Sequence, residues 1–151
     1  MSNKIIFLDV DGPMIPARMY YAGMLGPRLY TSGGGWVYDP VAIGMVTHLC
    51  IKHGVQIVYN SSHNDEGEDY IRAQAQNNQL GTFLHTHFMT KFPKATYIRA
   101  QAIDWWLRDH SEVTHWVNVD DFPVGAPNSI QIDYNVGITL TDFERMELRL
   151  K

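Results

Sequence analysis

The stretch that decides the fold is Ile5-Ile6-Phe7-Leu8-Asp9-Val10-Asp11-Gly12, close to the start of the chain. Its four apolar residues run without interruption, which is typical of a strand buried on both faces of a parallel sheet. Two carboxylates, two residues apart, follow the apolar run directly and are followed by a glycine. The stretch therefore predicts a strand buried on both faces of the sheet, with reactive side chains at its carboxyl end.

Outside this stretch, strand patterns alternate with helix patterns. Asp39 is a good helix cap before Pro40, and the apolar residues that follow recur at helical spacing until Gly54. Because parallel strands need crossover helices, the alternation predicts an α/β fold, a Rossmann-like three-layer sandwich around a parallel sheet of about five strands. Further strands are predicted over residues 55–59, 82–85, 115–119 and 129–132, and further helices over 66–78, 94–109 and from a cap at Thr141.

The segment from about residue 16 to 38 interrupts this alternation as a glycine-rich insertion after the first strand. Insertions of this length are commonly lids or binding loops, so the segment is predicted to be a minimal cap, or flap. Its aromatic side chains either stack on a base or pack the flap against the body. They are Tyr20, Tyr21, Tyr30, Trp36 and Tyr38.

Composition narrows the class of protein. The 151 residues predict a single domain spanning 1–151, and 45% apolar residues exclude a disordered chain. Twelve Lys and Arg against sixteen Asp and Glu give a net charge of −4, which argues against nonspecific coating of nucleic acid. With Cys50 alone, no intrachain disulfide is expected. No apolar run is long enough for a signal peptide or a membrane span, so a cytoplasmic protein with no membrane partner is expected.

Polar side chains follow three of the predicted strands. Asp9 and Asp11 follow the first, residues 60–64 (Asn-Ser-Ser-His-Asn) the second, and Asp120 and Asp121 end the fourth. Ligands of such sheets bind at the carboxyl ends of the strands, so these groups are expected to converge. Clustered carboxylates repel one another without a cation, and hard oxygen ligands suit Mg²⁺. A magnesium-dependent phosphate site is predicted.

These residue types suggest separate catalytic roles. One acid of the Asp9–Asp11 pair can attack phosphorus while the other protonates the leaving oxygen and later activates water. The Ser61 hydroxyl can hold phosphoryl oxygens, with substrate contacts from Ser62 and His63. A cation is also needed to neutralise the charge of the transition state. The candidates for this cation are Arg99, Lys94 and Lys91.

Residues 5–12 resemble the first motif of the haloacid dehalogenase (HAD) superfamily of phosphohydrolases, and residues 55–62 resemble its second. Residues 99–103 are the best match for the third motif, and residues 116–121 for the fourth. Residues 132–139 are similar to the end of the small HAD domains associated with RNA-repair proteins, which are often phage-encoded and also carry a serine pair at the second motif. The resemblance spans nearly the whole chain.

The resemblance implies a phosphatase that works through an aspartyl-phosphate. It implies Asp9 as the nucleophile, Asp11 as the general acid and base, and Ser61 as a phosphate ligand. It also implies Arg99 as the transition-state cation and a Mg²⁺ site at Asp120 and Asp121, completed by the Asp9 side chain and the Asp11 carbonyl. The expected substrate is a phosphorylated small molecule or nucleotide, or a nucleic-acid end.

Two positions depart from the superfamily pattern. Pro13 stands where Thr or Val is usual and removes a backbone donor from the turn. Arg99 stands where Lys is usual; it suits bidentate phosphate binding but leaves Lys91 and Lys94 as competitors.

Other interpretations remain open from sequence. The fold could be retained as a non-catalytic phosphate-binding or partner-binding domain. His85 and His87, with His63, could form a metal cluster, because imidazole suits zinc. Trp105 and Trp106 are expected to be core and rim residues of a helix.

Overall fold

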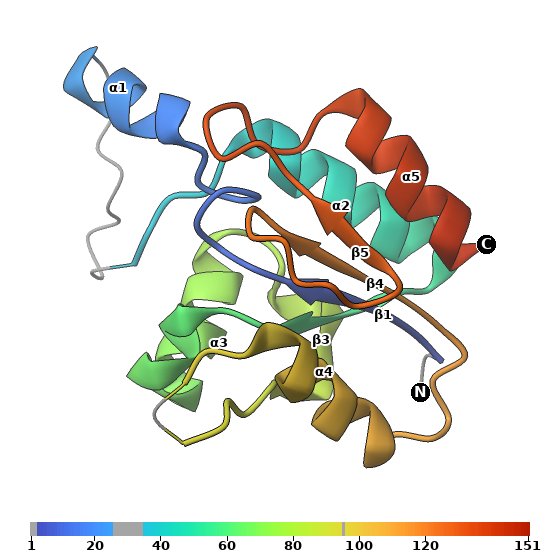
Figure 1. The fold of residues 1–151 in the computed structure, drawn as a ribbon. Coiled ribbons are helices and arrows are strands. Elements are labelled where there is room, and N and C mark those ends of the chain that lie inside the picture. The colour runs from blue at the N-terminus through green and yellow to red at the C-terminus, as the bar shows by residue number, and fades with distance from the viewer. Residues whose placement is uncertain (1–2, 26–34, 95) are drawn as a thin grey trace.

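A computed structural model of the protein describes residues 3–25, 35–94 and 96–151. Five parallel strands form one sheet in the order β3-β2-β1-β4-β5 (Figure 1). The α/β Rossmann-like prediction is confirmed. The strands are β1 (Lys4–Leu8), β2 (Gln56–Tyr59), β3 (Leu84–Met89), β4 (His115–Asp120) and β5 (Ser129–Gln131).

The burial of β1 on both faces agrees with its apolar composition. Ile5, Ile6, Phe7 and Leu8 are all fully buried, because β1 has a strand on each side and helices above and below. Leu8 pairs with Tyr59 of β2 and with Val119 of β4. This register brings the carboxyl ends of the three strands level with one another, and the polar residues that follow them therefore share one edge.

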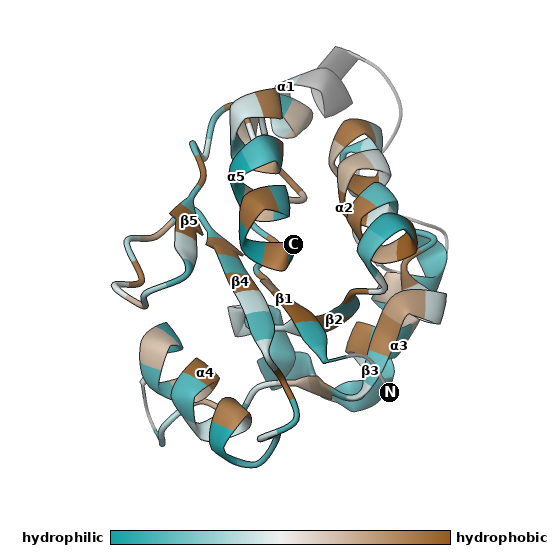
Figure 2. Cartoon of the chain, turned by 90° about the vertical axis from the view of Figure 1, so that its right-hand side faces the viewer, coloured by the Kyte–Doolittle hydropathy of each residue, from teal (hydrophilic) through white to brown (hydrophobic). Residues whose placement is uncertain are grey.

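The helices cover both faces of the sheet (Figure 2). Apolar side chains of α2, α3 and α5 join the larger core on one face, and α4 packs Ile103 and Trp106 against Phe7 on the other. Trp105 is 39% exposed and Trp106 is buried, as expected for rim and core. The helices are α1 (Ala17–Leu25), α2 (Pro40–His53), α3 (Glu68–Asn77), α4 (Arg99–Arg108) and α5 (Leu140–Leu150).

Helix α2 begins and ends as its sequence predicts. The Asp39 side chain accepts a hydrogen bond from the Val41 amide, Pro40 occupies the first turn, and Gly54 closes the helix in the left-handed conformation. In the described part of the chain no helix is both long enough and apolar enough to cross a membrane.

Four predicted elements have bounds that differ by two residues or more from those in the structure. Strand β3 begins at Leu84 rather than 82, because residues 81–83 form a turn of 3-10 helix, η2 (Gly81–Phe83), and it continues to Met89. Helix α4 begins at Arg99 rather than 94, after an irregular segment containing Pro93. Helix α5 is capped by Thr139, not Thr141. Helix α3 is shorter than predicted, because residues 62–66 form a separate 3-10 turn, η1 (Ser62–Glu66).

The insertion contains a helix that its glycine content did not predict. Helix α1 extends beyond the body of the molecule in Figure 1 and is held at its start by an Arg18–Asp39 ion pair of 2.6 Å. Tyr38 is fully buried, and its hydroxyl forms a hydrogen bond with that of Tyr59. The ring centroids of Trp36 and Tyr20 are 5.9 Å apart. These three aromatics therefore pack against the body. Tyr30 lies outside the described residues.

Candidate active site

Asp9 stands at the centre of the carboxyl edge of the sheet. Its amide donates to the Val119 carbonyl at 3.0 Å, which continues the β1–β4 ladder by one residue, and its side chain is 2% exposed. The Asn60 amide donates to the Leu8 carbonyl on the other side. The backbone on both sides therefore fixes where the Asp9 carboxylate lies.

Arg99 joins two of the strand-end carboxylates. Its Nη1 lies 3.1 Å from Asp9 Oδ1, and its Nε lies 3.2 Å from Asp120 Oδ2. Nη1 also donates to the Asn60 carbonyl at 2.5 Å. Arg99 is the first residue of α4, so this helix delivers the cation from the face opposite α2. Of the three candidate cations, Arg99 is the one that the structure brings to Asp9.

The two carboxylates beside Arg99 are difficult to ionise. Burial and the neighbouring Asp120 raise the pKa of Asp9 well above its usual value, although Arg99 and hydrogen bonds from Val10 and Ser61 oppose the rise. Burial raises the pKa of Asp120 to about 6. Asp120 Oδ1 accepts a hydrogen bond from the Phe122 amide, whereas Oδ2 has the Arg99 ion pair and no hydrogen bond among the described residues. The single guanidinium of Arg99 does not supply enough positive charge to offset two buried carboxylates.

Asp121 completes an acidic group that could hold a metal ion. One oxygen from each of Asp9, Asp120 and Asp121 lies within 4.8 Å of the others. Three carboxylate oxygens match the preference of a hard divalent cation, and such an ion would relieve the repulsion that raises the two pKa values. The residues present therefore fit the Mg²⁺ that the resemblance implies.

Asp11 lies at the outer side of this group and faces a histidine. His63 Nε2 is 3.0 Å from Asp11 Oδ2, and the side chain of Asp11 is 42% exposed while that of His63 is 12% exposed. Ser61 begins the η1 turn, because its hydroxyl oxygen accepts the His63 amide at 3.2 Å. The 61–63 turn thus places His63 on the acid that can reach solvent.

Three polar residues that were given no role from the sequence support this edge. Asn64 Nδ2 donates to the carbonyls of Tyr59 and Thr90, at 2.9 and 3.1 Å, and ties β2 to the end of β3. The Thr90 hydroxyl donates to Asn60 Oδ1 at 2.7 Å. Asn60 and Asn64 lay within the predicted cluster, but no spacing rule indicated that Thr90 would meet them.

The remaining predicted residues are more peripheral. Ser62 is exposed and lines a cavity of about 340 Å³ with Arg99. Lys94 is exposed, and no ion pair among the described residues joins it to the acids; Lys91 lines a different cavity. The other residues that line the cavity beside Ser62 and Arg99 are mainly apolar: Tyr97, Ile98, Ala100, Phe122, Pro123 and Val124.

Pro13 does not leave the turn after β1 short of donors. The amides of Met14 and Ile15 both donate to the Val10 carbonyl at 3.0 Å, and the Gly12 amide donates to the Ile15 carbonyl at 3.1 Å. The missing Pro13 amide is therefore not needed to hold the turn that carries Asp11.

The histidines that lie together in the structure are not the three suggested from the sequence. His63 pairs with Asp11, whereas His85 and His87 lie near His110, which the sequence analysis did not select. His110 follows α4 and is distant in sequence from the other two, so only the tertiary structure brings them together.

A parallel sheet whose carboxyl edge joins an Asp-x-Asp pair, a serine-capped turn and an arginine bridging two acids defines an α/β domain of HAD type. The comparison of the sequence with protein families agrees. Residues 5–143 match the family described as the HAD domain in Swiss Army Knife RNA repair proteins. The chain belongs to this family, which is of phosphohydrolase type and linked to RNA repair. Comparison with curated proteins and with solved structures gave no match.

Proposed function

We propose that the protein is a Mg²⁺-dependent phosphomonoester hydrolase that acts through an aspartyl-phosphate at Asp9. Its substrate is the terminal phosphate of a nucleotide or of a nucleic-acid strand. The observation that carries the proposal is the bridge of Arg99 between Asp9 and Asp120, at 3.1 and 3.2 Å, at the carboxyl edge of the sheet.

This bridge suits phosphoryl transfer because the guanidinium lies beside the attacking oxygen. In the first step an Asp9 carboxylate oxygen bonds to phosphorus, the bond from phosphorus to the ester oxygen breaks, and Asp11 protonates the departing alcohol. In the second step Asp11 takes a proton from water, whose oxygen attacks phosphorus and releases phosphate and free Asp9. Arg99 and the Ser61 hydroxyl stabilise the charge on the phosphoryl oxygens in both steps.

His63 would orient Asp11 between these steps. Its contact with Asp11 Oδ2 at 3.0 Å holds one carboxyl oxygen, which leaves Oδ1 to exchange a proton with the leaving group or water. Ser62, exposed at the mouth of the adjacent cavity, is placed to contact the substrate.

Mg²⁺ would be held by Asp9, Asp120 and Asp121, together with the Asp11 carbonyl that the family resemblance implies. When bound, the ion supplies positive charge that favours the ionised form of Asp9 and offsets the charge of the phosphate. Without such charge, the raised pKa of Asp9 would keep the nucleophile protonated more of the time.

The cavity beside Arg99 favours a substrate with a flat apolar part. Tyr97 and Phe122 line this cavity and are 53% and 65% exposed, so both rings present apolar area that a ligand could cover. Stacking of a base on an aromatic ring contributes about 1–3 kcal/mol. Together with the link of the family to RNA repair, this surface supports a nucleotide or RNA end rather than a small sugar phosphate.

The decisive experiment compares Asp9→Asn with the parent in phosphate release from p-nitrophenyl phosphate and a panel of nucleotides and phosphorylated RNA ends, with and without Mg²⁺. We expect the parent to turn over only with Mg²⁺, and Asp9→Asn to lose at least a thousandfold in kcat. Asp104→Asn is the matched control, because Asp104 is an exposed carboxylate on α4 that pairs with Arg108. Acid-quenched parent should carry phosphate on Asp9 by mass spectrometry. Full activity in Asp9→Asn would refute the nucleophile, and a folded parent that binds phosphate without turnover would favour a non-catalytic domain.

A further inference from the structure

Three histidines meet on the face of the sheet that α4 covers. His85 and His87 are two residues apart on β3, and His110 follows the end of α4. One ring nitrogen of each lies within 4.8 Å of the others, and the ring centroids are 5.1, 5.2 and 5.9 Å apart. Three imidazoles bound to one tetrahedral ion, with metal–nitrogen bonds of about 2.0–2.1 Å, place their ring centroids about 5 Å apart.

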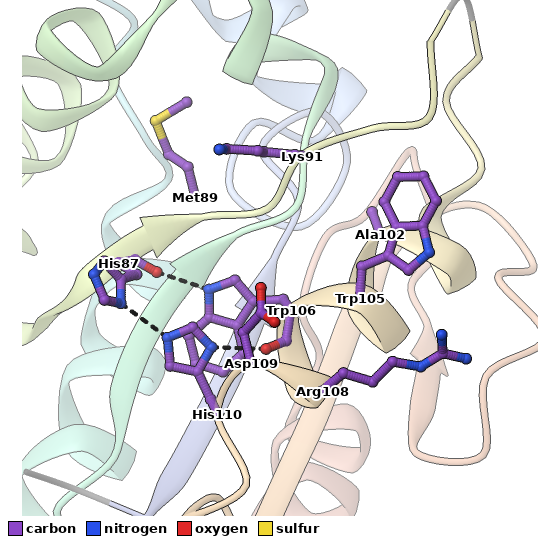
Figure 3. Close-up of a pocket in the computed structure, with 9 residues that line it drawn as sticks. All are labelled: His87, Met89, Lys91, Ala102, Trp105, Trp106, Arg108, Asp109 and His110. Atoms are coloured by element: carbon purple, nitrogen blue, oxygen red, sulfur yellow. Dashed lines mark hydrogen bonds between the residues drawn. The ribbon is translucent and has the colours of Figure 1, made fainter.

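His110 is already oriented as a ligand. Its Nδ1 donates to the Trp106 carbonyl at 2.7 Å, so Nε2 carries the lone pair, and this Nε2 lies 2.9 Å from His87 Nδ1 (Figure 3). A backbone carbonyl on the far nitrogen is the usual support of a metal-binding histidine. Tetrahedral bonds of that length separate two ligand nitrogens by about 3.3 Å, so the present spacing needs only a small opening.

Trp106 fixes both of these histidines. Its ring stacks on His110 at 3.6 Å, and its Nε1 donates to the His87 carbonyl at 2.9 Å. Figure 3 shows these contacts at one end of a cavity of about 550 Å³ that is also lined by Met89 and Asp109. His87 is exposed, so an ion held there has a path to solvent and room for a water as a further ligand.

His85 supplies the independent sign that the site lacks a partner. The residue is 2% exposed, and its Nε2 has no hydrogen-bond partner among the described residues. Buried ring nitrogens are normally satisfied, so an orphan Nε2 beside two other imidazoles leaves a position for a ligand once its proton has moved to Nδ1. Burial, together with His110 and His87, lowers the pKa of His85, which keeps it in the neutral form that binds metals.

We propose that His85, His87 and His110 bind one transition-metal ion of the Zn²⁺ class. Imidazole nitrogens without carboxylates select such an ion over Mg²⁺, whereas the oxygen set at Asp9, Asp120 and Asp121 has the opposite preference. The ion joins β3 to the end of α4, the helix whose first residue is Arg99. The site does not depend on the proposed phosphatase activity.

Binding requires tautomer changes but no net loss of protons. His87 Nδ1 now donates to His110, so its proton moves to the exposed Nε2 when Nδ1 binds the ion. His85 Nδ1 now accepts the His87 amide at 3.0 Å, which places the His85 proton on Nε2. To bind through Nε2, His85 moves that proton to Nδ1 and gives up the amide contact by rotating its ring.

The test is titration of the EDTA-treated 151-residue chain with Co²⁺, and then Zn²⁺ in competition, in excess Mg²⁺ to occupy the carboxylates. We expect one equivalent of Co²⁺ to give the intense visible absorption of a four-coordinate ion, and one equivalent of Zn²⁺ to remove it. His87→Gln and His110→Gln should each weaken Co²⁺ binding at least tenfold, and His85→Gln should do the same. The matched control is His115→Gln, because His115 is exposed on β4 outside the cluster.

The outcomes separate the possibilities. His87 is exposed, so His87→Gln should keep the metal-free melting temperature of the parent, and its loss of binding would not reflect misfolding. Binding of Co²⁺ that is equal in the parent and His87→Gln overturns the site. Weak absorption typical of six oxygen ligands, lost in Asp121→Asn but not in His110→Gln, assigns the ion to the carboxylates and also overturns it. Unchanged binding in His85→Gln overturns the three-histidine assignment.

Discussion

Gly12 meets two separate demands in the turn after β1. Its φ of +99° lies in the region that side chains rarely adopt, and a Cβ there would stand 2.7 Å from the Cβ of Asp121. The turn that carries Asp11 therefore passes directly against one of the candidate metal ligands. No side chain larger than hydrogen fits without moving Asp121 or the turn.

We expect Gly12→Ala to lower the free energy of unfolding by about 1–3 kcal/mol, through strained backbone and contact with Asp121. Urea unfolding measures this cost, and Mg²⁺-dependent activity should fall with it. Gly44→Ala is the control, because Gly44 lies inside α2 with open space around it. That variant should gain about 0.5–1 kcal/mol from helix propensity. Equal stability of the two variants would show that Gly12 is not constrained.

Asp120 gives the metal-free protein a measurable pH dependence. Its pKa of about 6 in the folded chain exceeds its ordinary value of 3.8, so the folded state holds the proton more tightly. The cost of the buried charge is therefore absent below about pH 4 and fully present above about pH 6. In that interval this residue lowers stability as pH rises.

Asp120→Asn should remove this cost without removing the side chain. Relative to the parent in EDTA, we expect the variant to be more stable by about 1–3 kcal/mol at pH 7.5 and to lose that advantage at pH 4. Thermal melts of both proteins at the two pH values measure the difference, and comparison at equal pH cancels the titration of the histidines. An advantage that is constant across pH would contradict the raised pKa.

The sequence predicted those site residues that lie at the carboxyl end of a predicted strand. Asp9, Ser61 and Asp120 were selected in this way, and the structure gathers all three at one edge. Thr90 and His110 were not selected, because each becomes significant only through a partner far along the chain, Asn60 in one case and His87 in the other. Local sequence patterns do not identify contacts between residues that are far apart in the chain.

At the scale of the elements, α5 depends on a reciprocal cap. The Thr139 hydroxyl accepts the Asp142 amide at 3.2 Å, and Asp142 Oδ2 accepts the Thr139 amide at 3.0 Å. This capping box satisfies backbone donors that the first turn leaves free. The sequence placed the cap at Thr141, but that residue lies inside the first turn.

Thr139→Ala should therefore destabilise the protein by about 1 kcal/mol, while Thr141→Ala should be nearly neutral. Chemical denaturation of the two variants against the parent measures the difference. Because α5 packs on α2 and β4 rather than on Asp9, phosphate release by folded Thr139→Ala should match that of the parent. A larger loss in Thr141→Ala would favour the cap predicted from sequence.

The elements that sequence placed correctly are those with a strong local signal. Helix α2 has a cap, a proline and a closing glycine, and residues 5–8 of β1 are a continuous apolar run. Strand β3 lies at the sheet edge with an exposed middle, so its pattern over 82–89 has no clear period, and its start was misplaced. Edge strands give weaker patterns because they have one strand neighbour.

At the scale of the whole molecule, the sequence predicted a parallel sheet but not the order of its strands. Right-handed crossovers and strand–helix alternation predict a parallel sheet, but the position of β1 between β2 and β4 depends on contacts that no single segment encodes. Helix α1 was missed in the same way, because the glycines of the insertion indicate a loop while its nine helical residues precede most of them.

The charge of the whole molecule limits how it can recognise a nucleic-acid end. The net charge is −4, and at least seven of the twelve Lys and Arg residues form ion pairs with carboxylates. At most five of the twelve cations lie outside these pairs and could contact a phosphate backbone along a strand. Recognition should therefore depend on the terminal phosphate and the residues beside it.

We expect kcat/KM for phosphorylated RNA to stop rising with length beyond two or three nucleotides. Each backbone phosphate contacted on a single strand contributes a slope of about −0.7 to a plot of log affinity against log salt. With one or two such contacts, log kcat/KM should fall against log salt with a slope of about −1. Initial rates on a ladder of RNA lengths, at fixed Mg²⁺ and varied KCl, measure both quantities, and p-nitrophenyl phosphate is the length-independent control. A slope steeper than about −3, with kcat/KM rising up to ten nucleotides, would instead require a basic track along the surface and would refute recognition of the end alone.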